Sequence, residues 1–233
     1  MNTRVLIAGG GIGGLAAALA CTRAGCDVRL FERAAEFGEV GAGIQIGPNV
    51  VHVLRRLGLE GALAEVAAFP LRLQVRNAVS GRELGVLPLG ERSVEQYGAP
   101  YATIHRADLH ALLRAALERD GRARLALGSW LASYTDGEHL VSLETTEGLV
   151  VEGEVLIGAD GLWSRVRELM LNDRAPRISG HLAYRAMLRQ QDLPERLRSQ
   201  QVTAWLGPRL HVVQYPVRGG DWLNVVAIVH GEV

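Results

Sequence analysis

The stretch VLIAGGGIGG, residues 5–14, followed by FER at residues 31–33, decides the fold of this chain. A short apolar run leads into glycines at the G-x-G-x-x-G spacing (Gly9, Gly11 and Gly14), and an alanine-rich stretch follows. Strand, glycine turn and helix in this order are typical of a dinucleotide-binding βαβ unit, which a lone glycine motif would not establish. The sequence therefore predicts a Rossmann-like nucleotide site at the start of the chain.

Each residue of this motif has a physical task. Gly9 permits a tight turn, Gly11 lets the backbone approach a pyrophosphate, and Gly14 lets the helix lie against the strand. Gly13 lies at the positive helix N-terminus, which faces the anion. Glu32 ends the second strand, where its carboxylate can accept hydrogen bonds from a ribose diol.

Composition disfavours several other classes of protein. The 233 residues are 48% hydrophobic, and 25 basic side chains balance 25 acidic ones, so charge gives no reason to expect a nucleic-acid partner. Cys21 and Cys26 lack the spacing of a disulfide framework or a metal site, so we expect a reducing cytoplasm and no metal. Glycines interrupt the uncharged run of residues 5–22, so we expect neither a membrane span nor a secretion signal.

Hydrophobic periodicity predicts where the other elements lie. Predicted helices cover residues 13–24, 49–57, 106–119 and 162–171. Predicted strands cover residues 4–8, 27–31, 124–127, 131–134, 140–145, 149–152, 155–157, 182–188, 201–206, 210–217 and 222–229, with short alternating stretches within 70–104. The strand at 155–157 is expected to be fully buried. Residues 38–48, GEVGAGIQIGP, hold too many glycines for a stable strand and are too apolar for an exposed loop, so their backbone is expected to approach a ligand.

Motifs at long separations together resemble the FAD-dependent aromatic hydroxylases, which are flavoprotein monooxygenases, and in particular the salicylate hydroxylase and 3-hydroxybenzoate 6-hydroxylase group. They are the N-terminal fingerprint ending in Glu32 and Arg33, the stretch GADGLWSRVR at residues 158–167, and the stretch HRADL at residues 105–109. The segment GAGIQIGPN at residues 41–49 is similar to the family's flavin-contacting loop.

The resemblance implies FAD as the cofactor and a set of contacts to it. Glu32 would hold the adenosine ribose, and Leu131 would offer backbone to the adenine. Arg106 and Asp160 would contact the pyrophosphate and ribityl region, although a position between glycines also suits a simple turn aspartate. The implied cofactor-binding residues are Gly9, Gly11, Gly13, Gly14, Glu32, Arg33, Gly43, Arg106, Leu131 and Asp160.

The resemblance also implies an α/β fold, in which a Rossmann-like FAD-binding domain of the glutathione-reductase type carries an inserted antiparallel β-sheet substrate domain. The FAD-binding domain would comprise residues 1–70 and 101–177, and the substrate domain residues 71–100 and 178–233. Members of the family carry a further Gly-Asp motif downstream of the β domain, which this sequence lacks. We therefore expect the chain to be the N-terminal portion of a longer enzyme.

The stretch LHVVQYPV, residues 210–217, carries the candidate catalytic residues His211 and Tyr215. Side chains alternate along a strand, so these two share one face. In the resembled hydroxylases, residues at this spacing line the substrate pocket and the histidine serves as base. Without the resemblance, the sequence favours an exposed sheet face for His211 over a catalytic position. Arg185 on an earlier strand either binds a substrate carboxylate or braces the sheet, and His105 and His181 are expected to be structural.

The implied reaction is hydroxylation of a phenolic aromatic acid through a flavin C4a-hydroperoxide, with O2 and NADH or NADPH as transient co-substrates. A phenolate is richer in electrons than a phenol, and a histidine that titrates near neutrality can take its proton. Two alternatives stay open: an NAD-dependent dehydrogenase, which leaves the Arg106 and Asp160 motifs unassigned, and an inactive truncated fragment with weak nucleotide binding. The sequence leaves the oligomeric state open, with a homodimer as one alternative.

Overall fold

Contacts divide the chain into two compact units, each assembled from two stretches of sequence. The structure is a computed structural model, and the residues that it describes are 2–38, 41–172 and 175–231. Unit 1 comprises residues 1–39 and 110–177, and unit 2 comprises residues 40–109 and 178–233. Within the predicted glycine segment 38–48, residues 39 and 40 lie outside the described residues.

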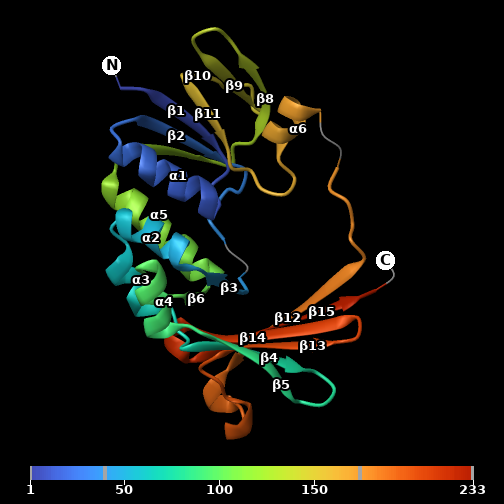
Figure 1. Ribbon diagram of the computed structural model, residues 1–233. Coiled ribbons are helices and arrows are strands. Elements are labelled where there is room, and N and C mark those ends of the chain that lie inside the picture. Colours follow the sequence, from blue (N-terminus) through green and yellow to red (C-terminus); the bar gives the residue numbers. More distant parts are fainter. Residues whose placement is uncertain (1, 39–40, 173–174, 232–233) are drawn as a thin grey trace. The chain divides into compact units, whose positions relative to one another are not determined.

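Unit 1 is built on a parallel four-stranded sheet with the strand order β11-β1-β2-β7 (Figure 1). Its strands are β1 (Arg4–Ala8), β2 (Asp27–Glu32), β7 (Ala123–Leu127) and β11 (Val155–Gly158). Helix α1 (Ile12–Arg23) connects β1 to β2, which is the predicted βαβ unit. The helix buries one face, made by Gly14, Leu15, Ala18, Leu19 and Thr22.

Helix α1 ends where its sequence predicts. Gly25 has a φ of +86°, in the left-handed region that favours glycine. The N–H of Gly25 donates to the C=O of Thr22, and the N–H of Cys26 donates to the C=O of Cys21. These two bonds form a Schellman motif, which satisfies carbonyls at the helix C-terminus.

A second, antiparallel sheet in unit 1 has the order β10-β9-β8 and contacts the short helix α6. Its strands are β8 (Leu131–Asp136), β9 (Val141–Thr145) and β10 (Val150–Gly153), and α6 covers Arg165–Leu171. Buried side chains from both sheets and from α6 form one core, made of Leu6, Ala8, Phe31, Leu131, Val141, Leu143, Val151 and Val166. Burying each large apolar side chain contributes about 1.5–3 kcal/mol, which holds these layers together.

Unit 2 contains a six-stranded sheet with the order β12-β15-β14-β13-β4-β5 (Figure 1). Its strands are β4 (Arg72–Asn77), β5 (Glu83–Pro88), β12 (His181–Arg189), β13 (Val202–Gly207), β14 (Leu210–Val217) and β15 (Trp222–His230). The strands are antiparallel to their neighbours except for β13 and β4, which are parallel. The predicted antiparallel sheet is therefore observed, with the β13–β4 pair as a parallel exception. The sequence could not indicate this exception, because strand direction across long connections leaves no mark on side-chain alternation.

The remaining elements complete unit 2. Strand β3 (Gly43–Ile46) pairs antiparallel with β6 (Ala102–His105). Helix α5 (Arg106–Asp120) begins in unit 2 and continues into unit 1. The other helices and 3-10 turns are α2 (Pro48–Arg56), α3 (Glu60–Val66), α4 (Gly90–Tyr97), η1 (Gln190–Asp192), η2 (Glu195–Leu197) and η3 (Arg218–Gly220).

Some local predictions differ from the structure. Residues Gly43–Ile46 form β3 despite their glycine, because β6 supplies backbone partners. Helices α3 and α4 were not expected. Each buries a single residue, Leu63 in α3 and Ser93 in α4, so neither shows a repeating pattern of buried apolar side chains. Strand β11 is not fully buried: it ends the sheet order, and its first residue, Val155, is 42% exposed.

The predicted domains and the observed units divide the chain differently. The prediction assigns residues 40–70 and 101–109 to FAD binding, whereas their contacts place them in unit 2. Contact density does not say which residues touch a cofactor, so the functional division stays a prediction. Among the described residues, no helix is both long and apolar enough to cross a bilayer.

Candidate functional site: the dinucleotide turn and the substrate-side sheet

The glycine turn at the start of α1 fits a bound pyrophosphate. Gly9 has a φ of +106°, and a Cβ on Gly14 would lie 1.8 Å from the carbonyl oxygen of Gly9. Both positions therefore demand glycine for the turn itself. A Cβ on Gly11 or Gly13 would meet nothing within 4 Å. Their backbone thus faces open space at the positive end of α1, where an anion is stabilised.

The carboxylate of Glu32 is fixed by backbone donors. Its Oε2 accepts a hydrogen bond from the N–H of Gly10 at 2.6 Å, and its Oε1 accepts one from the N–H of Ala34 at 2.9 Å. The predicted ribose-binding acid therefore stands directly beside the glycine turn. Carboxylate oxygens have further lone pairs, so these bonds leave acceptor capacity for a ribose diol.

The two distant motifs of unit 1 meet at this turn. A Cβ on Gly9 would lie 2.3 Å from the carbonyl oxygen of Ala159 and 2.8 Å from the Cα of Asp160. The N–H of Ala159 donates to the C=O of Ala8 at 2.7 Å. The glycine turn and the GADG motif are therefore in direct backbone contact, as a single cofactor site requires.

Asp160 itself caps helix α6. Its Oδ2 accepts hydrogen bonds from the N–H groups of Arg165 at 2.7 Å and Val166 at 3.1 Å, and its Oδ1 accepts one from the hydroxyl of Ser164. Ser164 Oγ in turn accepts from the N–H of Arg167 at 3.0 Å. The first N–H groups of α6 are thereby satisfied by side chains. The carboxylate is thus held rigidly beside the turn, and its predicted contact to the cofactor stays a prediction.

Arg33 and Leu131, both predicted as cofactor-binding residues, lie in unit 1 beside Trp130 in space or sequence. The guanidinium of Arg33 lies 5.7 Å from the ring centre of Trp130, a cation–π arrangement. Leu131, only 4% exposed, follows Trp130 and belongs to the core of unit 1. Trp130 was not singled out from the sequence, because an isolated aromatic carries no motif.

A second residue that the sequence analysis did not identify is His110. Its Nε2 lies 2.9 Å from the carbonyl oxygen of Gly10, and its side chain is buried. A carbonyl only accepts, so Nε2 carries the proton and donates. The ring of Phe37 packs on this imidazole with centroids 5.3 Å apart. Gly10 is therefore held at its N–H by Glu32 and at its C=O by His110.

In unit 2, the glycine segment and Arg106 are joined through backbone. The N–H of Arg106 donates to the C=O of Ala42 at 3.0 Å. Gly43 accepts a hydrogen bond from the hydroxyl of Tyr215 at 2.6 Å and donates its N–H to Oδ1 of Asn224 at 2.7 Å. Gly43 and Arg106 are thus brought together, and Asn224 is a further contact that no sequence pattern indicated.

The candidate catalytic strand is β14, as predicted. Across the sheet His211 is paired with Leu206 and Ile228, and these three line a pocket of about 290 Å³ together with His181, Gly207, Arg209, Leu210 and His230. Burial raises the pKa of Tyr215 to about 12, with the guanidinium of Arg185 acting in the opposite direction. Tyr215 is therefore a neutral hydrogen-bond donor at physiological pH, and Arg185 stands close enough to influence it.

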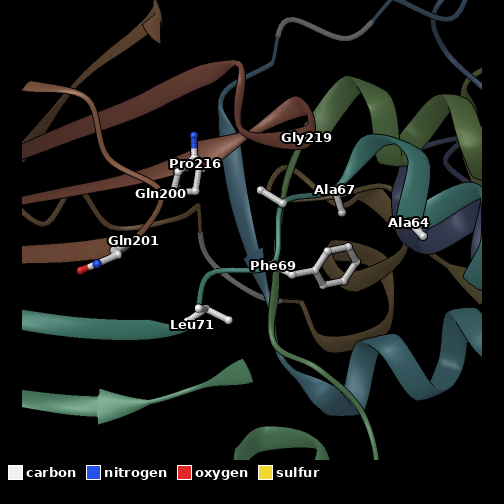
Figure 2. A pocket seen from close by; sticks show the side chains of 9 residues that line it. Ala64, Ala67, Phe69, Leu71, Gln200, Gln201, Pro216 and Gly219 are labelled. Carbon is white, nitrogen blue, oxygen red and sulfur yellow. The ribbon is translucent and has the colours of Figure 1, made fainter. Parts of the chain in front are cut away.

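A larger pocket of about 450 Å³ lies elsewhere in unit 2, as Figure 2 shows. Phe69, Leu71, Gln200, Gln201 and Pro216 are among the residues that line it. None of the sequence-predicted site residues lines this pocket. Among the described residues, no group of three or more His, Cys, Asp or Glu side chains is arranged to hold a metal ion.

Comparison with known proteins identifies the family. The sequence matches the family described as "FAD binding domain" over residues 2–205. The chain belongs to this FAD-binding domain family. The match confirms the resemblance and FAD as the cofactor. Alignment with a solved structure confirms the expected fold class.

Relatives of this FAD-binding domain protein are longer than the chain. The 3-hydroxybenzoate 6-hydroxylase 1 of Aquipseudomonas alcaligenes is 40% identical over 226 residues, which cover 97% of this chain and 57% of that protein. The structure of Klebsiella pneumoniae HpxO complexed with FAD and uric acid aligns with a TM-score of 0.87 at 24% identity, covering 99% of this chain and 57% of that one. A salicylate hydroxylase substrate complex aligns with a TM-score of 0.80 at 26% identity, covering 99% and 56%. The chain thus spans somewhat more than half of the length of these relatives.

Proposed function

We propose that the full-length protein is an FAD-dependent aromatic monooxygenase, which consumes NADH or NADPH and O2 to hydroxylate a phenolic aromatic acid. The observation that carries the proposal is the backbone contact of Gly9 with Ala159 and Asp160, which supports one cofactor site formed by both motifs. A nicotinamide dehydrogenase would leave the second motif with no task beyond the capping of α6. The 40% identical relative is a 3-hydroxybenzoate 6-hydroxylase, which supports the proposed substrate class.

Unit 1 is proposed to hold the adenosine and pyrophosphate of FAD. Gly11 and Gly13 would present backbone N–H groups to the pyrophosphate, and Glu32 would accept from the ribose. Arg33 and Leu131 would border the adenine. In unit 2, Gly43 and Arg106 are proposed as cofactor contacts on the strength of the family resemblance. When bound, FAD would supply the redox chemistry that protein side chains lack.

The face of β14 is proposed as the substrate side. His211 would take the phenol proton, since a phenolate ring is the better nucleophile towards activated oxygen. Arg185 is proposed to attract the substrate carboxylate, and its influence on the pKa of Tyr215 supports a position on the same face. Tyr215 is proposed to flank the ring of the substrate while its hydroxyl remains bonded to Gly43.

The experiment is a reconstitution of full-length protein with FAD, followed by NAD(P)H oxidation with 3-hydroxybenzoate, salicylate and benzoate. A hydroxylated phenolic acid as product would support the proposal, with benzoate as the non-phenolic control. The His211→Gln variant is expected to lower kcat by about 10²–10⁴-fold, the usual contribution of a general base. Failure of every phenolic acid to stimulate oxidation, or NAD in place of FAD in the purified protein, would overturn the proposal.

The coenzyme, the compartment and the assembly are proposed separately, each with its own support or test. Comparing NADH with NADPH in the same assay decides the coenzyme. Cys21 and Cys26 are free, which suits a reducing cytoplasm. A homodimer stays a prediction that light scattering on the full-length protein tests.

A further inference from the structure

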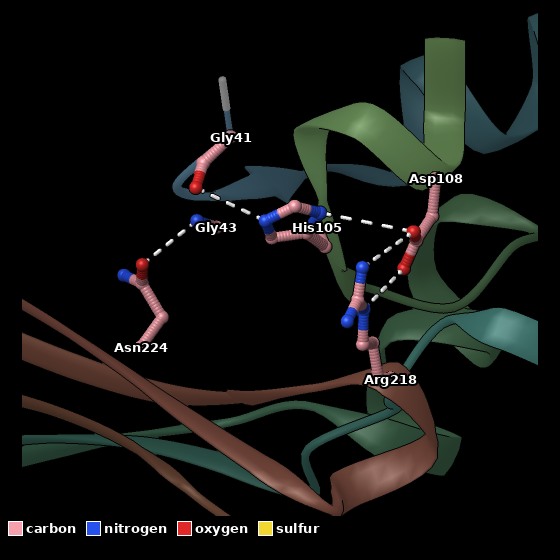
Figure 3. Close-up of polar contacts among 6 residues, drawn as sticks. All are labelled: Gly41, Gly43, His105, Asp108, Arg218 and Asn224. Carbon is pink, nitrogen blue, oxygen red and sulfur yellow. Dashed lines mark hydrogen bonds and ion pairs between the residues drawn. The ribbon is translucent and has the colours of Figure 1, made fainter. Parts of the chain in front are cut away.

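Side chains form hydrogen bonds to the backbone at both ends of the segment Gly41–Gly43. Nε2 of His105 is hydrogen-bonded to the carbonyl oxygen of Gly41 at 3.0 Å. The N–H of Gly43 donates to Oδ1 of Asn224 at 2.7 Å (Figure 3). The hydroxyl of Tyr215 donates to the carbonyl of Gly43 at 2.6 Å. All of these residues belong to unit 2. The segment therefore owes its conformation to side chains that lie far from it in the sequence.

These side chains explain why the segment carries glycine. A Cβ on Gly41 would lie 2.4 Å from Cε1 of His105, and a Cβ on Gly43 would lie 2.6 Å from Cε2 of Tyr215 and 2.8 Å from Cγ of Asn224. Neither glycine has the positive φ that would demand glycine for backbone reasons. The two glycines leave space for the side chains of His105, Tyr215 and Asn224. The sequence alone suggested that they leave space for a ligand.

The imidazole of His105 connects the segment to an ion pair. A carbonyl only accepts, so Nε2 carries a proton and donates to Gly41. Nδ1 has no hydrogen-bond partner among the described residues and lies 3.7 Å from Oδ1 of Asp108, so the carboxylate attracts the ring only when Nδ1 is protonated as well. Arg218 holds that carboxylate with two parallel contacts, Nε to Oδ2 at 3.0 Å and Nη2 to Oδ1 at 3.1 Å. The ring of His105 is therefore hydrogen-bonded to the carbonyl of Gly41 and, when protonated at both nitrogens, paired with a carboxylate that Arg218 holds.

The hydrogen bond of Asn224 to Gly43 comes with a buried, unsatisfied amide donor. The side chain is fully buried, and among the described residues its Nδ2 has no hydrogen-bond partner. Leaving a buried amide donor unsatisfied lowers the stability of the folded state. A leucine would avoid this cost and would fill the space, but it could not accept the N–H of Gly43.

We propose that His105, oriented by Asp108 and Arg218, is a positioning residue that fixes the carbonyl of Gly41, while Asn224 fixes the Gly43 end. This positioning role rests on the proposed function, in which the segment 41–49 borders the flavin. Asp108 and Arg218 are proposed to act only through His105. Their role is to hold the segment in its binding conformation before FAD arrives, which lowers the ordering cost of binding.

The test uses single variants of the full-length protein. His105→Phe removes both nitrogens but keeps a ring, and it is expected to raise the dissociation constant of FAD about tenfold, as the loss of one buried hydrogen bond would. His105→Gln keeps an N–H donor and is expected to restore affinity to within about threefold of the wild type. Asp108→Asn and Arg218→Lys are expected to have intermediate effects. An unchanged dissociation constant in His105→Phe would overturn the proposal.

Asp120 offers a matched control. Like Asp108, it is held by two contacts from one arginine, with Arg122 Nε at 2.8 Å and Nη2 at 2.6 Å, but it lies in unit 1. Asp120→Asn is expected to leave FAD affinity unchanged. The double variant His105→Phe/Asp108→Asn is expected to bind FAD no more weakly than His105→Phe alone. Fully additive losses would show that Asp108 does not act through His105, and would overturn that step.

A measurement without FAD separates this inference from the proposed function. Hydrogen exchange of a peptide covering Gly41–Ile46 is followed by mass spectrometry in FAD-free protein. Each variant is compared with the wild type at the same number of degrees below its own unfolding temperature. His105→Phe and Asp108→Asn are expected to exchange this peptide faster than the wild type and Asp120→Asn. Asn224→Leu tests the Gly43 end in the same way. Equal exchange in all variants would overturn the inference even if FAD binds, whereas faster exchange without any FAD binding would leave it standing and reject the proposed function.

Discussion

The N–H of Gly10 donates to the carboxylate of Glu32 at 2.6 Å, so the acid at the end of β2 holds the glycine turn at the end of β1. The predicted ribose ligand is therefore also part of the structure of the turn. A motif that is usually explained by its ligand is stabilised from within the protein before any ligand binds.

This double task predicts the effect of Glu32→Gln. The amide keeps one acceptor oxygen but loses the charge, so it can satisfy only one of the two backbone N–H groups and binds ribose less well. Hydrogen bonds to a charged group contribute about 1.5–3 kcal/mol, so we expect FAD to bind about 10–100-fold more weakly. Fluorescence titration with FAD measures this, with exposed Glu138→Gln as the control. Equal affinities in both variants would contradict the assignment.

The glycines of the turn are expected to respond differently to alanine. Gly14→Ala places a Cβ 1.8 Å from a backbone oxygen, so we expect a loss of at least about 1–3 kcal/mol in the free energy of unfolding. Gly11→Ala meets nothing within 4 Å, so it should fold as well as the wild type but bind FAD at least about tenfold more weakly. Urea unfolding and FAD titration separate the two effects. A Gly11→Ala variant with full affinity would show that no pyrophosphate approaches this position.

Asp160→Ala should destabilise unit 1 even without FAD. The carboxylate accepts the N–H groups of Arg165 and Val166 at the start of α6, and loss of such a cap costs about 0.5–2 kcal/mol. Asp160→Asn should recover part of this loss, because its amide oxygen still accepts. Thermal unfolding of FAD-free protein, with exposed Asp136→Ala as the control, measures the effect. If Asp160→Ala is as stable as the control, the carboxylate serves only a ligand.

Tyr215 and Tyr101 should ionise late in an alkaline titration. Burial raises the pKa of each to about 12, from an ordinary value of 10.0. The folded state therefore favours the protonated phenol, and this contribution to stability is complete below pH 10 and is lost as pH rises from 10 towards 12. Ultraviolet difference spectra of the wild type and Tyr215→Phe should differ only near pH 12. A Tyr215 that ionises near pH 10 would contradict its burial and its bond to Gly43.

Local pattern determined much of the fold. The order of apolar run, glycines and alanine-rich helix predicted β1, α1 and β2, since each follows from contacts a few residues apart. Gly25 predicted the end of α1 for the same reason. The elements that were missed, α3 and α4, bury too few apolar side chains to leave a period in the sequence.

The sequence by itself determined the family and the cofactor class, because the motifs that carry the resemblance are short local runs of residues. The roles of the individual site residues stay a prediction. Only the tertiary structure decided that Asp160 caps α6, that His110 holds Gly10, and that Tyr215 and Asn224 hold Gly43. These contacts join residues up to 181 positions apart. A hydrogen bond at such a separation depends on how strands pair and pack. The sequence around either partner therefore does not indicate which distant group it will contact.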